Sequence, residues 1–380
     1  WFLTCHFMDD RVMPGTLMYE CCAHTLRVFI QRMGWVTAKS GTCYEPVEGV
    51  ESVLKCRGPV TPETRHVWYE VEIKELGYTP EPYVIADALM YADGQRIVLF
   101  KDMSMKMTGI AREEIEEVWE KSEDRVQRTE DRGQRSEDRD QRLEISGQRP
   151  EDRGRKTEVR SQKTENRGQR TEVSGQRSED RGQRTEVSGQ RSEDRRQRSE
   201  DREQRIESGN QYPASSIQHP DTRIRKPAVF DRDKILAFAI GKPSEAFGEP
   251  YRVFDKDRKI ARLPGPPYSF LDRIVSVEPE AWALKPGGWI EAQYDVSPDE
   301  WYFKADRSSF MPFCVLLEIA LQPCGWLAAY LGSALHSDKD LKFRNLGGNA
   351  VLNRMILPDK KTLSMQARMT KVSRDDHRTF

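Results

Sequence analysis

Residues 13–33 read MPGTLMYECCAHTLRVFIQRM, in which a Pro-Gly pair introduces a long apolar stretch. The apolar side chains leave little polar surface around a helical period of 3.6 residues. These side chains are Leu17, Met18, Cys21, Cys22, Leu26, Phe29, Ile30 and Met33. The pattern predicts a helix over 16–33 that is buried on most sides and ends at Gly34.

Four strand-like runs follow this helix, at 52–60, 66–76, 83–91 and 96–107. Apolar and polar residues alternate most clearly in the second run, which is typical of a half-buried strand. Asp93-Gly94 supplies a hairpin turn between the last two runs. A buried helix followed by antiparallel strands predicts an α+β unit over 1–112, in which a sheet wraps around the helix.

A seven-residue unit is repeated thirteen times without a break between Lys121 and Gln211. The repeat holds 24 Lys or Arg and 22 Asp or Glu residues but only seven apolar ones. A coiled coil needs apolar residues at two positions in seven, so the spacing does not indicate one. We expect 121–211 to be a disordered spacer within a linker over 113–226, because it cannot bury enough apolar surface to offset its chain entropy. A transient single helix and a translated DNA repeat without a selected role are the alternatives.

Composition excludes several classes of function. The net charge is −1, so no basic excess indicates nucleic acid binding. We find no apolar run of the roughly 18–20 residues that a membrane helix needs, and no charged-then-apolar leader. The seven cysteines lack C-x-x-C spacing, which favours a reducing, cytoplasmic compartment.

A second unit is expected over 227–380. Its composition returns to that of an ordinary globular domain after the polar, proline-containing end of the linker. It holds an apolar helix predicted over 313–331 and strand-like runs at 270–277, 289–296, 350–357 and 362–372.

The two units share a signature that indicates an internal duplication. WFLTCHF at 1–7 precedes MPGTLMYE at 13–20, and WYFKADR at 301–307 precedes MPFCVLLE at 311–318. Each copy has an aromatic segment that we expect to end a strand, then a short loop, Met-Pro and a glutamate on a buried helix. Asp306 or a neighbour stands where the first copy has His6, so the second copy lacks the histidine.

His6-Phe7-x-x-Asp10-x-x-Met13-Pro14-Gly15 resembles the H-F-x-G-D-P-x-M-P-G motif of FabA-like 3-hydroxyacyl-(acyl-carrier-protein) dehydratases, which have the hotdog fold. Asp9 replaces the motif glycine and Arg11 its proline. The second unit is similar to the paired dehydratase domains of polyunsaturated fatty acid synthases and polyketide-synthase-like multienzymes. That similarity is carried by MPFCVLLE at 311–318, ALQPCGWLAAY at 320–330 and FRNLGG at 343–348. The resemblance implies two hotdog lobes, each an antiparallel sheet around a central helix, able to form a double hotdog.

In that family a histidine from one lobe faces a carboxylate on the central helix of the other. The resemblance therefore implies His6 as the histidine and Glu318 as the facing acid, with Gln322 one turn on to orient it. A neutral imidazole suits removal of the C2 proton beside a thioester, and a positioned acid suits protonation of the departing 3-hydroxyl. The backbone N–H of Gly15, at a helix N-terminus, would stabilise the enolate-like oxygen, whereas Phe313 would crowd the equivalent position.

Neighbouring residues suggest other roles, which we disfavour. Glu20 is the equivalent acid of the first copy, but His24 stands where the second copy has its glutamine, so we interpret Glu20 as vestigial. A zinc site at Cys21, Cys22 and His24 is unsuitable because adjacent helix residues point in different directions. Cys5 beside the motif histidine suggests a nucleophile dyad, yet neighbours on a strand point to opposite faces.

The resemblance implies a 3-hydroxyacyl-ACP dehydratase, a hydro-lyase that forms a trans-2-enoyl thioester in fatty acid, polyunsaturated fatty acid or polyketide-type biosynthesis. No cofactor or metal is expected, because the phosphopantetheine of acyl carrier protein carries the substrate. Expected partners are acyl carrier protein domains, other synthase domains or subunits, and a second copy or lobe in a homodimer or double hotdog. The alternatives are a hotdog acyl thioesterase and a non-catalytic fragment that binds acyl chains or carrier protein.

The order of the units points to a fragment. In the similar synthases the histidine-lacking lobe comes first, whereas here it follows the spacer. We therefore expect the first lobe to lack its N-terminal strands and the second to be truncated at its end. His6 would then pair either with a lobe upstream of Trp1 or, across the spacer, with Glu318.

The composition of 121–211 generates a first prediction. Limited proteolysis of the full chain should cut within the repeat first and leave two resistant pieces, because chain without a core is cleaved most readily. The cut sites can be mapped by mass spectrometry. Strong amide hydrogen-exchange protection across the repeat would contradict the expectation.

Overall fold

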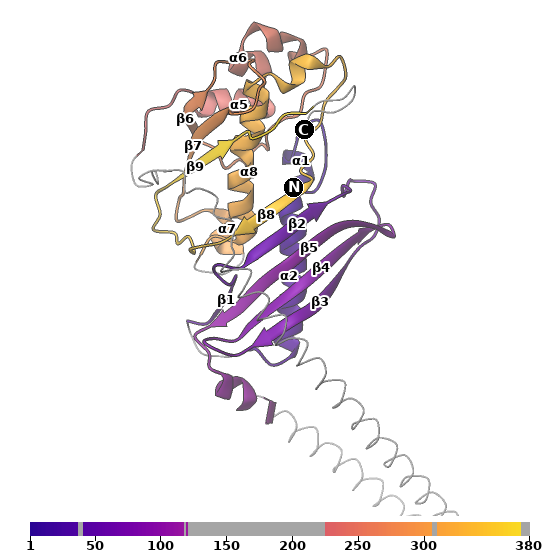
Figure 1. The fold of residues 1–380 in the computed structure, drawn as a ribbon, viewed down its shortest axis with the longest axis vertical. Coiled ribbons are helices and arrows are strands. Elements are labelled where there is room, and N and C mark those ends of the chain that lie inside the picture. The colour runs from indigo at the N-terminus through magenta and orange to yellow at the C-terminus, as the bar shows by residue number, and fades with distance from the viewer. Residues whose placement is uncertain (37–40, 118, 121–224, 306–309, 374–380) are drawn as a thin grey trace, which may run out of the picture. The chain divides into compact units, whose positions relative to one another are not determined.

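The computed structural model describes residues 1–36, 41–117, 119–120, 225–305 and 310–373. The predicted spacer over 121–211 lies outside this described part of the chain. Figure 1 shows two helix-and-sheet lobes, each with one long helix lying against its strands. The N-terminal lobe is formed mainly by residues 1–120 and the C-terminal lobe mainly by residues 225–373.

The N-terminal lobe contains one long helix and five strands of its own. These are α2 (Gly15–Arg32), β1 (Cys43–Glu45), β2 (Glu51–Cys56), β3 (Val67–Gly77), β4 (Tyr83–Ala92) and β5 (Gln95–Thr108). The sheet has the order β3-β4-β5-β2, β1 also pairs with β5, and every pairing is antiparallel. The predicted helix and four strands are confirmed, and their ends differ from the prediction by at most four residues.

Alternating burial along β4 explains how the sheet holds α2. Val84, Ala86, Ala88 and Met90 are fully buried, whereas the residues between them are half-buried. Side chains at every second position of a strand lie on one face, so this set forms one apolar surface. The helix contributes residues such as Ile30 to the same core, and the two small alanines leave room for a close approach.

The C-terminal lobe has a three-stranded antiparallel sheet of order β6-β7-β9. Its strands are β6 (Arg273–Glu278), β7 (Trp289–Asp295) and β9 (Thr362–Arg368), and its central helix is α8 (Phe313–Tyr330). Helix α8 contacts both β7 and β9, and it also contacts α2 of the other lobe. The strands predicted over 270–277, 289–296 and 362–372 and the helix over 313–331 are therefore confirmed.

A helical segment before β6 has no counterpart among the predicted elements. It comprises α5 (Arg232–Ile240), α6 (Pro243–Phe247) and the 3-10 helix η1 (Glu249–Asp255). Asp231 caps α5 by accepting a hydrogen bond from the backbone amide of Lys234 at 3.1 Å, a signal that the sequence does contain. The segment packs on the C-terminal core around the fully buried Trp326. A second 3-10 helix, η2 (Ser333–His336), follows α8.

The strand predicted over 350–357 in the second unit is displaced along the chain and joins the sheet of the other lobe. Instead of a strand over 350–357, the structure has β8 (Gly347–Val351), which pairs antiparallel with β2. The C-terminal segment thereby adds the sixth strand to the N-terminal sheet. Periodicity cannot reveal such an exchange, because a strand pattern does not specify which edge the strand joins.

Two segments expected to end strands are helical. They are α1 (Phe2–Cys5) and α7 (Trp301–Ala305), and the amide of His6 closes the first by donating to the carbonyl of Phe2 at 2.9 Å. The rings of Trp1 and Trp301 pack edge to face, with centroids 5.3 Å apart. These aromatic residues thus pack between the lobes, and this tertiary contact overrides their strand propensity.

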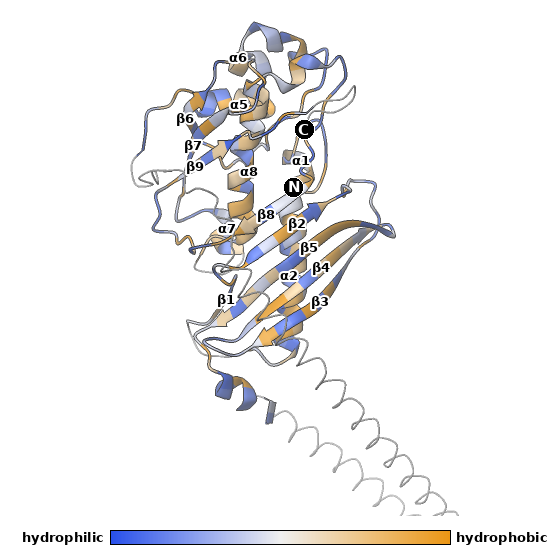
Figure 2. Ribbon diagram, in the orientation of Figure 1, coloured by the Kyte–Doolittle hydropathy of each residue, from blue (hydrophilic) through white to orange (hydrophobic). Residues whose placement is uncertain are grey.

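Helix α8 is apolar along most of its length (Figure 2). Its 18 residues have a mean hydropathy of 1.4, so among the described residues it is the one helix that could cross a membrane by length and composition. The expectation that no such run exists is therefore too strict. The same composition suits a core helix, since ten of its residues are buried among the lobes.

Candidate active site

The N-terminus of α2 opens into a cavity of about 540 Å³ lined by both lobes. Pro14 is the N-cap of this helix, so the first backbone amides, beginning at Gly15, have no acceptor within the helix. The cavity is lined by His6, Gly15 and Thr16 from the N-terminal lobe and by Glu318 and Gln322 from α8. Apolar walls are supplied by Met13, Met18, Leu263, Leu321, Phe343 and Leu346, among others. All four residues predicted for the site therefore border the same cavity.

His6 follows α1 directly and is 8% exposed. Its Nδ1 lies 3.0 Å from the carbonyl oxygen of Val12. A carbonyl only accepts, so Nδ1 carries the hydrogen and Nε2 keeps a lone pair in the neutral ring. Burial lowers the pKa of His6 to about 4, and the hydrogen bond to Val12 opposes this only in part. The imidazole is therefore neutral near pH 7 and can accept a proton.

The loop after His6 is held by cations of the C-terminal lobe. Asp10 forms ion pairs with Arg344 and with Lys342, the latter at 3.1 Å. Burial acts to raise the pKa of Asp10, but hydrogen bonds from these two side chains hold it below its ordinary value. Asp9, which stands where the motif has glycine, lies 3.8 Å from the buried guanidinium of Arg262. The departure from the motif thus supplies an anion to a buried cation.

Glu318 is 5% exposed and receives one hydrogen bond at each carboxyl oxygen. The hydroxyl of Thr16 donates to Oε2 at 3.0 Å, and Nε2 of Gln322 donates to Oε1 at 3.3 Å. Burial raises the pKa of Glu318 to about 7, although both hydrogen bonds lower it. A carboxyl with such a pKa is protonated in a large fraction of molecules near neutral pH and can act as an acid.

The orientation of Gln322 is determined by two backbone groups. Its Oε1 accepts from the amide of Phe270 at 2.8 Å, and its Nε2 donates to the carbonyl of Tyr268 at 2.8 Å. Exchange of the amide ends would break both bonds, so the nitrogen faces Glu318. The prediction that Gln322 lies one helical turn from the acid and contacts it agrees with this geometry.

The equivalent acid of the N-terminal lobe has different surroundings. Glu20 lies 2.9 Å from the ring of His24, and this partner holds its pKa below the ordinary value despite burial, which acts to raise it. The cavity beside it is only about 30 Å³, roughly the volume of one water molecule. Phe313 forms part of its wall, at the position equivalent to Gly15. Glu20 therefore borders a much smaller cavity than Glu318 does, and its carboxyl is more readily ionised.

Residues 1–101 and 263–380 match the model of a family described as "FabA-like domain". The two segments make up more than half of the chain. The chain belongs to the FabA-like domain family. It is also similar to one of the subunits of a polyunsaturated fatty acid synthase from Thraustochytrium sp. (strain ATCC 26185 / S-3), with 25% identity over 388 residues. That match covers 92% of this chain but only 25% of the relative's length. The resemblance and the hotdog fold expected from it are thus confirmed.

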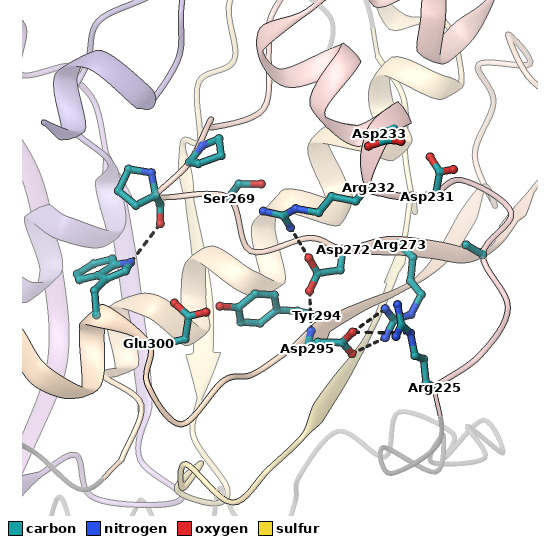
Figure 3. Close-up of a pocket in the computed structure, with 14 residues that line it drawn as sticks. Arg225, Asp231, Arg232, Asp233, Ser269, Asp272, Arg273, Tyr294, Asp295 and Glu300 are labelled. Atoms are coloured by element: carbon teal, nitrogen blue, oxygen red, sulfur yellow. Dashed lines mark hydrogen bonds and ion pairs between the residues drawn. The ribbon is translucent and has the colours of Figure 1, made fainter.

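The FabA-like fold holds a second, charged cavity of about 600 Å³ in its C-terminal lobe. Figure 3 shows that Arg232 and Arg273 each face a carboxylate of this cavity. Arg232 contacts Asp272, and Arg273 donates to Asp295 at 2.8 Å. These pairs hold the carboxylates of Asp272 and Asp295 against guanidinium groups, whereas the smaller cavity between the lobes holds a neutral histidine and a carboxyl with a raised pKa.

Sequence reasoning missed two residues of the FabA-like site, Thr16 and Tyr268. Their hydroxyl oxygens lie 3.0 Å apart, and Thr16 also contacts the acid. No local pattern links residues so far apart in sequence. The argument from strand geometry against Cys5 as a nucleophile is wrong, because this residue lies in helix α1. Burial raises the pKa of its thiol, and this disfavours the thiolate that a nucleophile needs.

Proposed function

We propose that this FabA-like chain is a 3-hydroxyacyl-ACP dehydratase whose site is composed of both lobes. The observation that carries the proposal is that one cavity is lined both by a buried histidine, neutral near pH 7, and by a buried carboxyl whose pKa is raised to about 7. His6 acts as the base and Glu318 as the acid, with Gln322 as the residue that orients the acid. The match to a fatty acid synthase subunit supports the same reaction class.

The reaction follows from the positions of these groups. Nε2 of His6 takes the proton from C2 of the acyl thioester, and the electron pair of that bond forms the C2–C3 double bond. The C3–O bond breaks as Glu318 protonates the 3-hydroxyl, which leaves as water. The site is then left with a protonated His6 and an ionised Glu318, and transfer of one proton between them restores the starting state. The trans-2-enoyl thioester is the product.

Gly15 supplies the donor for the charge that develops on the thioester oxygen. Its amide lies at the N-terminus of α2, where the helix dipole favours negative charge. A Cβ at this position would lie 3.5 Å from Sγ of Cys56, an ordinary contact, so the fold itself does not require glycine. The missing side chain instead leaves the amide open to the cavity.

The cavity walls suit a substrate with an apolar chain. Met13, Met18, Leu263 and Leu321 line the space next to the two ionisable residues. We infer that phosphopantetheine of an acyl carrier protein delivers the chain, in a cytoplasmic multienzyme with other synthase domains or subunits. No metal or other cofactor takes part in the proposed steps.

One assay tests the proposal against its alternatives. The full chain is incubated with a 3-hydroxyacyl thioester and, separately, with the trans-2-enoyl thioester, and both acyl species and free thiol are measured. A dehydratase interconverts the two acyl species without releasing thiol. Release of thiol would indicate a thioesterase, and tight binding without either reaction would indicate a non-catalytic acyl-binding module.

Removal of the base gives a second prediction. His6→Ala should lower turnover by about 10²–10⁴-fold, the usual contribution of a general base, while the circular dichroism spectrum stays that of the parent. His24→Ala is the matched control, since His24 is the other helix-associated histidine of the same lobe and lies outside the cavity. Full activity of the His6 variant would contradict the assigned role.

The two equivalent glutamates give a third prediction. Glu318→Gln should lower turnover by about 10²–10⁴-fold, because a carboxamide keeps the shape of the side chain but cannot deliver the proton. Glu20→Gln should change turnover by less than about threefold, since its carboxylate pairs with His24 outside the cavity. Equal losses in the two variants, or a larger loss at Glu20, would mean that the acid belongs to the other lobe.

The pH dependence gives a fourth prediction. Dehydration needs a neutral His6, which is lost as the pH falls through about 4, and a protonated Glu318, which is lost as the pH rises through about 7. A plot of log kcat/KM against pH should therefore be bell-shaped with limbs near these values. The reverse reaction, hydration of the enoyl thioester, needs one proton in total on His6 and Glu318, as dehydration does. Its pH profile should therefore have limbs at the same pH values. An activity that keeps rising above pH 8 would exclude Glu318 as the acid.

A further inference from the structure

Two buried hydroxyl groups adjoin the proposed acid. Thr16 lies in the first turn of α2 and is 3% exposed, and Tyr268 lies in the stretch before β6 and is 0% exposed. The hydroxyl oxygen of Thr16 is 3.0 Å from the Tyr268 hydroxyl and 3.0 Å from Oε2 of Glu318. The three oxygens thus form a continuous chain across the lobe interface, with Thr16 in the middle.

The hydrogens of this chain have two arrangements. An ionised Glu318 can only accept, so Thr16 donates to it and Tyr268 donates to Thr16. When Oε2 carries the proton, the acid can donate to Thr16, whose own hydrogen then turns to the oxygen of Tyr268. All three oxygens keep a partner in both arrangements, and only hydrogens move.

The other carboxyl oxygen has no such freedom. Gln322 has its amide fixed by the backbone of residues 268 and 270, so it can only donate to Oε1. The proton of the neutral acid is therefore placed on Oε2, the oxygen that faces the hydroxyl chain.

We propose that Thr16 and Tyr268 are positioning residues, which form a reversible hydroxyl relay that stabilises Glu318 both before and after it gives up its proton. The proposal rests on the role of Glu318 as the acid. It deepens that role, because it names the groups that let one buried carboxyl be satisfied in both states. Tyr268 stays protonated throughout, since burial raises its pKa far above the working range.

Several other titratable or charged groups lie around this site. Cys5 of the N-terminal lobe interacts electrostatically with Glu318, His6, Arg57 and Arg344 line the same cavity, and Cys314 lies near Tyr268. Burial raises the pKa of the Cys5 thiol, so ionisation of this thiol does not mimic the effect of a change at Thr16. His6 titrates near pH 4, well separated from Glu318.

Three substitutions in the full chain test the relay. Thr16→Val keeps the shape of the side chain but removes its hydroxyl, whereas Thr16→Ser keeps the hydroxyl. Tyr268→Phe removes the Tyr268 hydroxyl and leaves that of Thr16 in place. In Thr16→Val we expect kcat to fall by about 10- to 100-fold, the usual effect of losing one hydrogen bond to a charged group, while KM stays near that of the parent. The alkaline limb of the pH profile should move up by about one pH unit, because the ionised acid has lost a donor. Thr16→Ser should restore both properties.

A titration that does not require activity separates this inference from the proposed function. Infrared difference spectra follow the C=O band of the protonated Glu318 carboxyl, which Glu318→Gln identifies by its absence. The midpoint should rise in Thr16→Val, rise less in Tyr268→Phe and stay unchanged in Thr16→Ser. A raised midpoint in a chain without dehydratase activity would overturn the proposed function and keep the relay. An unchanged midpoint in Thr16→Val, or in Tyr268→Phe if the valine variant does not fold, would overturn the relay.

Discussion

Burial of the Glu318 carboxyl between the lobes is the constraint on which the site depends. A side chain that is 5% exposed cannot rely on water, so each of its oxygens needs a partner from the protein. Gln322 supplies one from the same helix and Thr16 supplies the other from the opposite lobe. The acid is therefore fully satisfied only where the two lobes meet. The same burial raises its pKa, so its position and its protonation state have one cause.

The N-terminal lobe shows how the same residue type behaves without that constraint. Glu20 occupies the equivalent position on α2, but a histidine one turn away pairs with it and favours its charged form. The side chain of Phe313 lies where a substrate would need space. The pKa of the glutamate at this helical position is thus raised in the C-terminal lobe and lowered in the N-terminal lobe, because the neighbouring residues differ. The two lobes thus offer two comparable positions for a site, and side-chain packing leaves a large cavity at only one of them.

Features that depend on local pattern could be predicted from the sequence. The central helices follow from their apolar periodicity, and the placement of Gln322 beside Glu318 follows from a spacing of one helical turn. Features that depend on contacts between distant segments could not. Aromatic residues at 1–7 suggested a strand because their packing on the other lobe is not visible in a local window. Thr16 and Tyr268 are 252 residues apart, and only the folded chain brings their hydroxyls together.

The interface between the lobes also fixes the proposed base. Strand β8 of the C-terminal segment completes the N-terminal sheet, and Arg344, just before this strand, pairs with Asp10 in the loop that follows His6. Asp9 in the same loop gives the buried Arg262 an anion, without which burial of that cation would be costly. The proposed base and the proposed acid therefore come from different lobes, and each is held in place by residues of the opposite lobe. It follows that their separation is determined by the contacts between the lobes.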